Sequence, residues 1–140
     1  MKILLAVDGS KYTKRMLRYL AAHDEFLGAA HDHTMFTAVP VIPARIAIFM
    51  SRSAIDDYYR DQAENVFRPA RAFSKRHGWK VREVHVNGAA GQLIAEQAKA
   101  QKFDLIVMGT HGRSAIGTLI LGSVASVVLA LSKVPVLLIR

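Results

Sequence analysis

The stretch between Asp104 and Ser123 carries the clearest chemical signal in this sequence. A short apolar run is followed by four glycines, in the order Gly109-Thr-His-Gly112-Arg-Ser-Ala-Ile-Gly117-Thr-Leu-Ile-Leu-Gly122-Ser123. Glycine lets the backbone approach a polyphosphate closely and adopt positive φ. The free amides and positive dipole end of a helix that begins at Gly122-Ser123 would attract phosphate oxygens. We therefore expect an anion cradle, although the spacing is that of neither a P-loop nor a dinucleotide fingerprint.

A second candidate loop, Asp8-Gly9-Ser10, follows the first apolar run of the chain. Ser10 is suited to cap the helix predicted after it, because its hydroxyl can accept a hydrogen bond from a free amide of the first turn. Asp8 stands at the end of a strand, where a carboxylate can accept from hydroxyl or amino groups of a ligand. The loop is thus either a ligand contact or simply a turn with a cap.

Four other polar residues are candidates for chemistry. His111 could contact phosphate or accept a proton, but no visible carboxylate orients it, so we expect no catalytic residue. Arg113 could pair with phosphate or point into water, and both alternatives remain open. His31 and His33 resemble a metal pair without a third ligand, so a solvated loop is the favoured interpretation and no metal site is predicted.

Alternating strands and helices must position these residues. Five segments predict strands, and helical patterns separate them: Lys2 to Val7, Met35 to Val39, Val81 to Val86, Asp104 to Met108 and Pro135 to Ile139. Several runs are unbroken, which is typical of a mostly parallel sheet covered on both faces. Ligands of such folds bind at the carboxyl ends of the strands, so the loops after the first, second and fourth strands are the ones of interest.

The second long helix is the least regular element. Ser53 and Asp56 resemble a capping box, and apolar residues continue at helical spacing toward Gly78. Pro69 lies inside this pattern, where it removes one backbone donor and clashes with the preceding turn. We therefore expect a kink or a break at Pro69.

The glycine spacing is similar to a known family signature. The pattern G-x-x-G-x9-G-[ST], satisfied by Gly109, Gly112, Gly122 and Ser123, resembles that of the ATP-binding branch of the universal stress protein family. Four further segments resemble the same family, in order and over the whole length: ILLAVDGS, DLIVMGTHGRS, LGSVA and VPVLLIR. Two residues depart from the family pattern: Ala115, where a further glycine is expected, and Pro69.

This resemblance implies a fold and a site. The fold is one doubly wound α/β domain over residues 1–140, with a five-stranded, mostly parallel sheet in the order 3-2-1-4-5 and about four helices on its two faces. The ligand is ATP, with any Mg²⁺ held mainly by phosphates and water. The implied binding residues are Ala6, Asp8, Val39, Met108, Gly109, His111, Gly112, Arg113, Gly122, Ser123 and Val124.

Each part of the ligand has expected neighbours. The resemblance implies that Asp8 faces the ribose and adenine, and that Ala6 and Val39 flank the base, whose edge the backbone of Val39 would read. The phosphates are expected on backbone groups of the remaining segments, namely those of Met108, Gly109, Gly112, Gly122, Ser123 and Val124.

Three classes of function follow from these residues. The first is a nucleotide sensor or carrier in a stress response, with little or no catalysis. The second is a slow ATPase, which is disfavoured because a Walker lysine and a water-activating carboxylate are missing. The third is a basic interaction module, since the formal net charge is +8. The cations are spread over helix faces, near Lys11 to Arg18 and Arg68 to Arg76, so nucleic acid is an unexpected partner.

The remaining expectations concern location and assembly. The sequence has no apolar run long enough to span a bilayer, no secretory signal and no cysteine. We expect a cytoplasmic protein without a membrane partner, with an unknown regulatory protein as a further possible partner. The apolar edge strand from Val134 to Ile139 predicts a homodimer, because such strands are seldom left bare.

Overall fold

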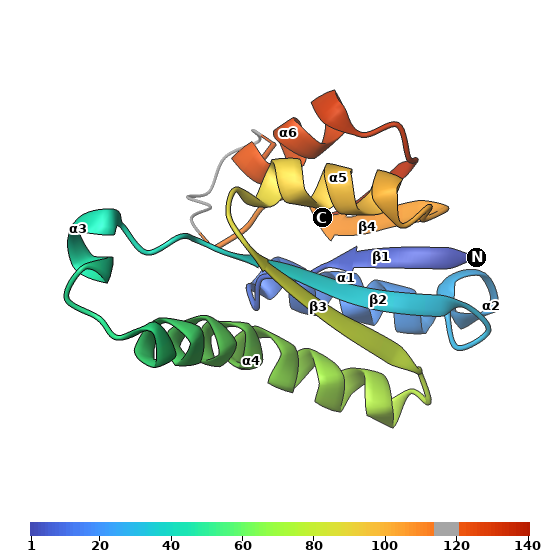
Figure 1. Ribbon diagram of the computed structural model, residues 1–140. Coiled ribbons are helices and arrows are strands. Elements are labelled where there is room, and N and C mark those ends of the chain that lie inside the picture. Colours follow the sequence, from blue (N-terminus) through green and yellow to red (C-terminus); the bar gives the residue numbers. More distant parts are fainter. Residues whose placement is uncertain (114–120) are drawn as a thin grey trace.

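A five-stranded parallel sheet forms the centre of the protein. The structure is a computed structural model and describes residues 1–113 and 121–140, so Ala115 and Gly117 lie outside the described residues. The sheet order is β3-β2-β1-β4-β5, as expected (Figure 1). The strands are β1 (Lys2–Ala6), β2 (Asp32–Val39), β3 (Val81–Asn87), β4 (Leu105–Gly109) and β5 (Val136–Ile139).

Helices cover both faces of this sheet. The described residues form α1 (Lys11–Ala22), α2 (Asp24–Leu27), α3 (Ala44–Ala47), α4 (Arg52–Arg76), α5 (Ala90–Ala100) and α6 (Ser123–Leu131). Helices α1 and α4 lie on one face and α5 and α6 on the other (Figure 1). The short helices α2 and α3 are additional to the four expected, and α3 stands away from the sheet. Within the described ranges, no helix has the length and apolarity needed to cross a membrane.

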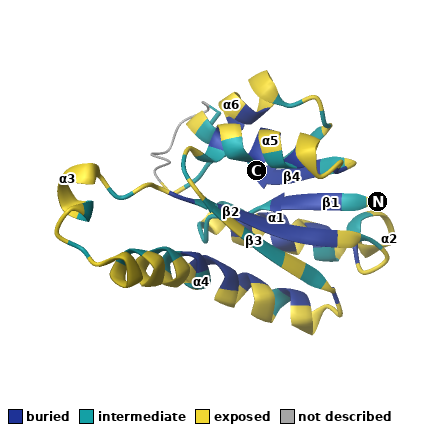
Figure 2. Ribbon diagram, viewed as in Figure 1, coloured by how far each residue is buried: buried dark blue, intermediate teal, exposed yellow. Residues whose placement is uncertain are grey.

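The central strand β1 shows why the sheet is buried on both sides. Ile3 and Leu5 pack with α1 and α4, whereas Leu4 packs with α5 and α6. All three are fully buried, which Figure 2 shows as the dark centre of the fold. Side chains of a strand alternate between faces, so an unbroken apolar run fits only a sheet covered twice.

Helix α4 differs from the expectation in two respects. Its N-cap is Ser51, whose hydroxyl accepts a hydrogen bond from Ala54 N–H at 3.1 Å, so the capping box predicted at Ser53 is wrong. The helix also continues from Arg52 through Pro69 to Arg76, so of the expected kink or break at Pro69 the break does not occur. Buried Val66 and Ala70 lie on either side of the proline. Burial of this face against the sheet offsets the lost hydrogen bond.

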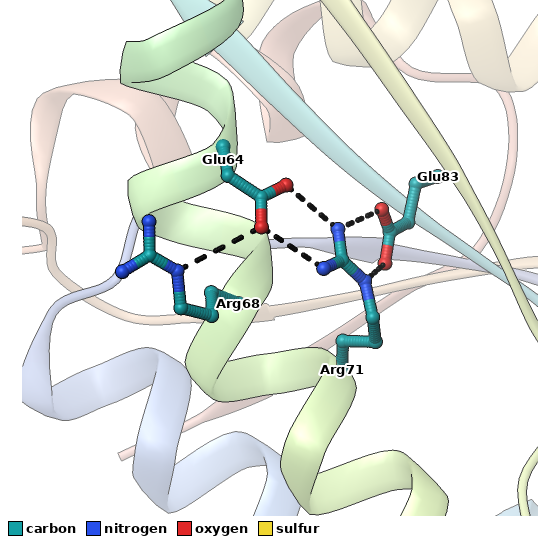
Figure 3. A network of polar contacts seen from close by, with 4 residues as sticks. All are labelled: Glu64, Arg68, Arg71 and Glu83. Carbon is teal, nitrogen blue, oxygen red and sulfur yellow. Dashed lines mark hydrogen bonds and ion pairs between the residues drawn. The ribbon is translucent and has the colours of Figure 1, made fainter.

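An ion-pair network ties α4 to the edge strand β3. Arg71 donates from Nε to Glu83 Oε1 at 2.7 Å and from Nη2 to Glu64 Oε2 at 2.8 Å, and Arg68 lies beside Glu64 (Figure 3). Hydrogen bonds to Glu83 and then to Glu64 raise the pKa of Arg71. The hydrogen bond from Arg71 lowers the pKa of Glu64 below its usual value. The hydrogen bonds of the network therefore favour the charged forms of Arg71 and Glu64.

His33 lies in the core, so the expectation of a solvated loop is wrong for His33, whereas His31 precedes β2 as expected. His33 belongs to β2 and is 2% exposed, and its ring stacks on that of Trp79 with centroids 5.3 Å apart. Its Nε2 lies 2.9 Å from the Leu27 carbonyl oxygen, while Nδ1 has no hydrogen-bond partner among the described residues. Burial is the main cause that lowers the pKa of His33.

Candidate functional site

A cavity of about 560 Å³ opens at the carboxyl ends of β1, β2 and β4. This is the edge of the sheet where the chain leaves β1 to one side and β4 to the other, and it is where ligands of such folds bind. The volume lies within the range of small-molecule sites. All eleven residues predicted for the site line this one cavity: Ala6, Asp8, Val39, Met108, Gly109, His111, Gly112, Arg113, Gly122, Ser123 and Val124.

The loop after β1 is held by the side chain of Asp8. Its Oδ1 accepts hydrogen bonds from Ser10 N–H at 2.9 Å and from Thr13 Oγ1 at 2.8 Å. Thr13 Oγ1 in turn accepts from Asp8 N–H at 3.0 Å. Gly9 between them has φ +75°, a conformation that glycine adopts without strain. Among the described residues, one carboxylate oxygen of Asp8 therefore builds the loop, and Oδ2 is the oxygen that we expect to meet a ligand.

The capping role predicted for Ser10 is confirmed. Its Oγ accepts from Tyr12 N–H at 3.2 Å and from Thr13 N–H at 3.4 Å. Two of the free amides in the first turn of α1 are thus satisfied by the protein itself, and they are not available to an anion.

Arg113 joins the two loops on either side of the cavity. Its Nε donates to the Asp8 carbonyl oxygen at 2.6 Å, across 105 residues of sequence. This bond uses Nε of the guanidinium, and the two alternatives held open for Arg113, pairing with phosphate and pointing into water, both stay predictions. Arg113 thereby holds the β4 loop against the β1 loop.

The signature glycines act through close packing of the protein on itself. A Cβ on Gly109 would lie 2.6 Å from Tyr12 Cβ, and one on Gly122 would lie 2.9 Å from the Thr110 carbonyl oxygen. A Cβ on Gly112 would lie 2.9 Å from Asp8 Oδ2. Among the described residues, positive φ occurs at other glycines, so the expectation of positive φ at these positions is wrong. The glycines bring α1, β4 and α6 close enough together to form one cavity.

Helix α6 begins at the cavity without a side-chain cap. Gly122 is its N-cap, and Gly122 N–H donates to Thr110 O at 2.8 Å, so this amide does not face a ligand as expected. The first helical bond runs from Ser126 N–H to Gly122 O at 2.9 Å. The amides of Ser123, Val124 and Ala125 precede it and have no acceptor within the helix. They form the positive end of the helix dipole at the cavity wall.

The strands and α5 give the cavity an apolar lining. Three neighbouring strands contribute Ala6, Phe36, Val39 and Met108, and α5 contributes Ile94. The Val39 carbonyl oxygen already accepts from Gly88 N–H at 2.9 Å. If Val39 reads a base edge, as the resemblance implies, its oxygen must use the second lone pair.

His111 has a defined environment. Its Nδ1 lies 2.9 Å from Thr110 Oγ1, and its ring packs beside Tyr12 with centroids 5.1 Å apart. These contacts orient the imidazole at the rim of the cavity.

Several lining residues were missed by the sequence reasoning. They are Val7, Thr13, Phe36, Thr37, Ala38, Pro40, Gln62, Val66, Ala90, Ile94 and Ala125. Ala90 and Ile94 belong to the helix after β3, and the rule that ligands bind at carboxyl strand ends could have included that connection. Gln62 and Val66 project from the middle of α4, and no local pattern marks them.

Comparison with known proteins gives consistent likenesses over the full chain. A family model described as "Universal stress protein family" matches residues 1–140. A universal stress protein of Thermus aquaticus, encoded in the QAH/OAS sulfhydrylase 3′ region, is 30% identical over 151 residues, covering 99% of this chain and 97% of the relative.

Solved structures agree with this. The hypothetical protein MJ0577 superposes with a TM-score of 0.81 at 25% identity, covering 99% of this chain and 94% of that chain. A universal stress protein solved in complex with cAMP superposes with a TM-score of 0.72 at 26% identity, covering 100% of this chain and 97% of that chain. With the whole length matched by the family model, by a relative and by these folds, the chain belongs to the universal stress protein family.

Proposed function

We propose that this protein binds an adenine nucleotide, ATP, in the cavity between the β1 and β4 loops and acts as a nucleotide-dependent regulator of a stress response. One observation carries the proposal: α6 starts at the cavity wall with its first-turn amides lacking helical acceptors. A nucleotide phosphate supplies the negative oxygens that such a helix start stabilises.

The other end of the cavity suits a base. Its walls hold Ala6, Phe36, Ile94 and Met108, whose apolar side chains can cover a flat ring. Asp8 Oδ2 lies beside Gly112 of the β4 loop, where a Cβ would be 2.9 Å from it, and we propose it as the acceptor for a ribose hydroxyl or an exocyclic amine. A related protein solved with cAMP supports an adenine nucleotide as the ligand class.

ATP and Mg²⁺ are the finer part of the proposal. The cavity lining includes polar residues of the β4 loop and α6. We propose that these residues contact the further phosphates of ATP. No group of three metal-ligating side chains occurs within residues 1–113 and 121–140, which supports Mg²⁺ held by phosphate oxygens and water.

Catalysis is proposed to be slow or absent. Asp8 is the acidic residue among the described lining residues, and its Oδ1 is engaged by Ser10 and Thr13. No lysine is among those lining residues. Fast phosphoryl transfer usually needs a positioned base or water-orienting group together with cations on the leaving phosphate. Phosphate release well above the buffer background, lost in His111→Ala, would contradict this part of the proposal.

The test places a carboxylate at the start of α6. Ser123→Asp puts a negative charge beside the amides proposed to hold phosphate, and a negative residue in a first turn favours the helix itself. We expect ATP affinity, measured by calorimetry, to fall about tenfold or more, a difference of about 1.4 kcal/mol, without loss of thermal stability. AMP and cAMP titrated in parallel report which nucleotide is preferred.

Ser53→Asp is the matched control. Ser53 is exposed in the first turn of α4 and is not part of the cavity lining. It introduces the same charge at a comparable helix position, so it should leave ATP affinity unchanged. If ATP binds the Ser123→Asp variant as tightly as the natural chain, phosphate is not held by α6 and the proposal fails.

A cytoplasmic location and a homodimer complete the proposed role. ATP is available in the cytoplasm, and a regulator there would present a different surface with and without ligand. The loops that line the cavity lead into α6 and β5, so a dimer formed through β5 would lie next to the ligand site in the chain. A regulatory protein partner would bind this assembly.

A further inference from the structure

A second hollow lies between α1 and α4, beside the Gly9 loop. Its volume is about 290 Å³, and it is lined by Gly9, Thr13, Lys14, Leu17, Arg18, Val66, Pro69, Ala70, Phe73 and Arg76. We propose that this groove, called here the α1–α4 groove, binds a small amphiphilic anion, with an apolar body on its floor and a carboxylate, sulfonate or phosphate head among its cations.

Charge on the rim selects an anion. Lys14 and Arg18 stand one helical turn apart on α1, and Arg76 stands opposite on α4. None of the described lining residues is acidic, and α1 contains no acidic residue. In the part of the chain that the structure describes, none of these three cations forms an ion pair. Arg71, by contrast, is paired with two glutamates.

The floor of the groove is apolar. Leu17, Val66 and Ala70 are core residues, and Phe73 packs against the same cluster. Pro69 adds a ring without a backbone N–H, so this turn of α4 presents no amide donor there. The proline that departs from the family pattern thus lies in the wall of the groove. An apolar body would replace water from this floor, which is favourable.

The size of the groove favours a small ligand over a polyanion. About 290 Å³ lies at the lower limit of small-molecule sites. Nucleic acid is bound by rows of cations that neutralise successive phosphates, and an apolar floor contributes nothing to that contact. Three cations around an apolar floor match one charged head on one apolar chain.

The groove adjoins the nucleotide cavity without coinciding with it. Thr13 and Val66 line both, and Thr13 Oγ1 donates to Asp8 Oδ1 at 2.8 Å. Other residues line the groove but not the cavity, among them Lys14, Arg18, Pro69, Phe73 and Arg76. Binding in the groove therefore does not depend on the proposed nucleotide, and it can be measured with the cavity saturated by ATP or empty.

The test follows backbone amide shifts of the full chain in NMR spectra while octanoate is added below its micelle concentration. We expect saturable shifts that concentrate at Leu17, Ala70 and Phe73. Octan-1-ol, which has the same chain without the charge, should bind about tenfold more weakly, because it lacks the charge-assisted hydrogen bonds. The octanoate titration is repeated with the cavity saturated by ATP. Binding in the groove should persist there, whereas binding in the cavity should be lost.

Arg18→Gln should weaken octanoate binding about tenfold for the same reason. Arg15→Gln is the matched control, because Arg15 is an exposed cation of the same helix that does not line the groove. Equal affinity for octanoate and octan-1-ol, equal affinity in Arg18→Gln, or shifts confined to the cavity residues Ala38 and Ala90 would overturn the assignment. Binding of a DNA duplex at Arg18, without binding of octanoate, would also overturn the assignment.

Discussion

Single residues of this protein do more than their types suggest. Gly109 and Gly122 stand in a loop whose glycine spacing indicates phosphate binding, yet each is required by a neighbour within the protein. At Gly109 the neighbour is Tyr12 at the start of α1, and at Gly122 it is the Thr110 carbonyl. The absence of a Cβ lets α1 and α6 approach β4, and the ligand cavity results from this approach.

Gly109→Ala should therefore cost both stability and ligand affinity. The added Cβ would lie 2.6 Å from Tyr12 Cβ, an atom that cannot move without its helix. We expect urea unfolding to show a loss of about 1–3 kcal/mol, as for other overpacked sites. Calorimetry should show weaker ATP binding, because α1 and the Asp8 loop move together.

Gly78→Ala serves as the comparison for this variant. Gly78 has φ +70°, but a Cβ there would meet nothing within 4 Å. We expect it to lose about 1–2 kcal/mol through backbone strain alone, with ATP affinity unchanged. If Gly109→Ala keeps the natural affinity, the close approach of α1 is unrelated to the cavity.

His33 makes stability depend on pH. Burial lowers its pKa in the folded protein below the usual 6.5, so the unfolded chain binds the proton more readily. The contribution of neutral His33 is complete above about pH 6.5 and is lost as the pH falls through 6.5 toward the lowered pKa. Protonation would also place an N–H at Nδ1, which has no partner among the described residues.

His33→Gln should flatten this dependence. Urea unfolding at pH 8, 7, 6 and 5 should show the natural chain losing up to about 1.4 kcal/mol per pH unit from this group below pH 6.5. The variant is expected to be less stable at pH 8, because it loses packing against Trp79, but to have a smaller slope. An unchanged slope would show that another group causes the acid sensitivity.

At the scale of elements, α4 is attached to the sheet by two kinds of contact. Its buried face includes Val66, Phe67 and Ala70, and these residues keep the helix continuous through Pro69. Its exposed side carries Arg71, which bridges to Glu83 on β3 (Figure 3). The apolar contacts position α4, and the ion pairs hold the edge strand against it.

Arg71→Gln should loosen β3 from α4. We expect a melting temperature lower by a few degrees at low salt, and a smaller difference at about 1 M salt, where partly exposed charges are screened. Arg71 lowers the pKa of Glu64 from its usual 4.5, so this contribution is present above pH 4.5 and is lost as the pH falls below it. Natural and variant chains should therefore converge in acid.

Arg82→Gln is the control for the network. Arg82 is an exposed cation on the same strand, outside the ion pairs found in the described residues. It should melt like the natural chain. A salt-independent loss in Arg71→Gln would instead indicate that the stem of Arg71 acts by packing.

At the scale of the whole molecule, the two edges of the sheet differ. The β3 edge carries Arg82, Glu83 and His85, and charged residues discourage pairing with another strand. The β5 edge reads Val-Leu-Leu-Ile and carries no charge. Thr110 N–H donates to Ile139 O at 2.9 Å, so alternate residues of β5, including Val136, turn their backbone groups away from β4. We therefore expect the β5 edge to be the one that pairs with a second copy.

Val136→Pro should convert the expected dimer into a monomer. The substitution removes an outward N–H and is tolerated on an edge strand. Light scattering should give twice 15.4 kDa for the natural chain and 15.4 kDa for the variant. His85→Pro on β3 is the control. Gly88 N–H faces β2, and backbone groups alternate in direction along a strand, so His85 N–H points outward from the other edge of the sheet. This variant should stay dimeric. A natural chain that is monomeric at all concentrations would refute the dimer.

Much of this protein was predictable from local patterns. Local patterns, several of them unbroken apolar runs, predicted all five strands, and the glycine spacing with Ser123 located the start of α6. The family resemblance added the sheet order. All residues predicted for the site line one cavity, because the carboxyl ends of parallel strands meet at one edge of the sheet.

Only the tertiary structure decided how those residues work together. The bond between Arg113 and Asp8 joins residues 105 positions apart, and the burial of His33 depends on Trp79 from another element. The α1–α4 groove likewise requires two helices that are distant in sequence. Periodicity, caps and turn residues record the preferences of short segments. Contacts between distant segments depend on how whole elements pack, which no short stretch of sequence encodes.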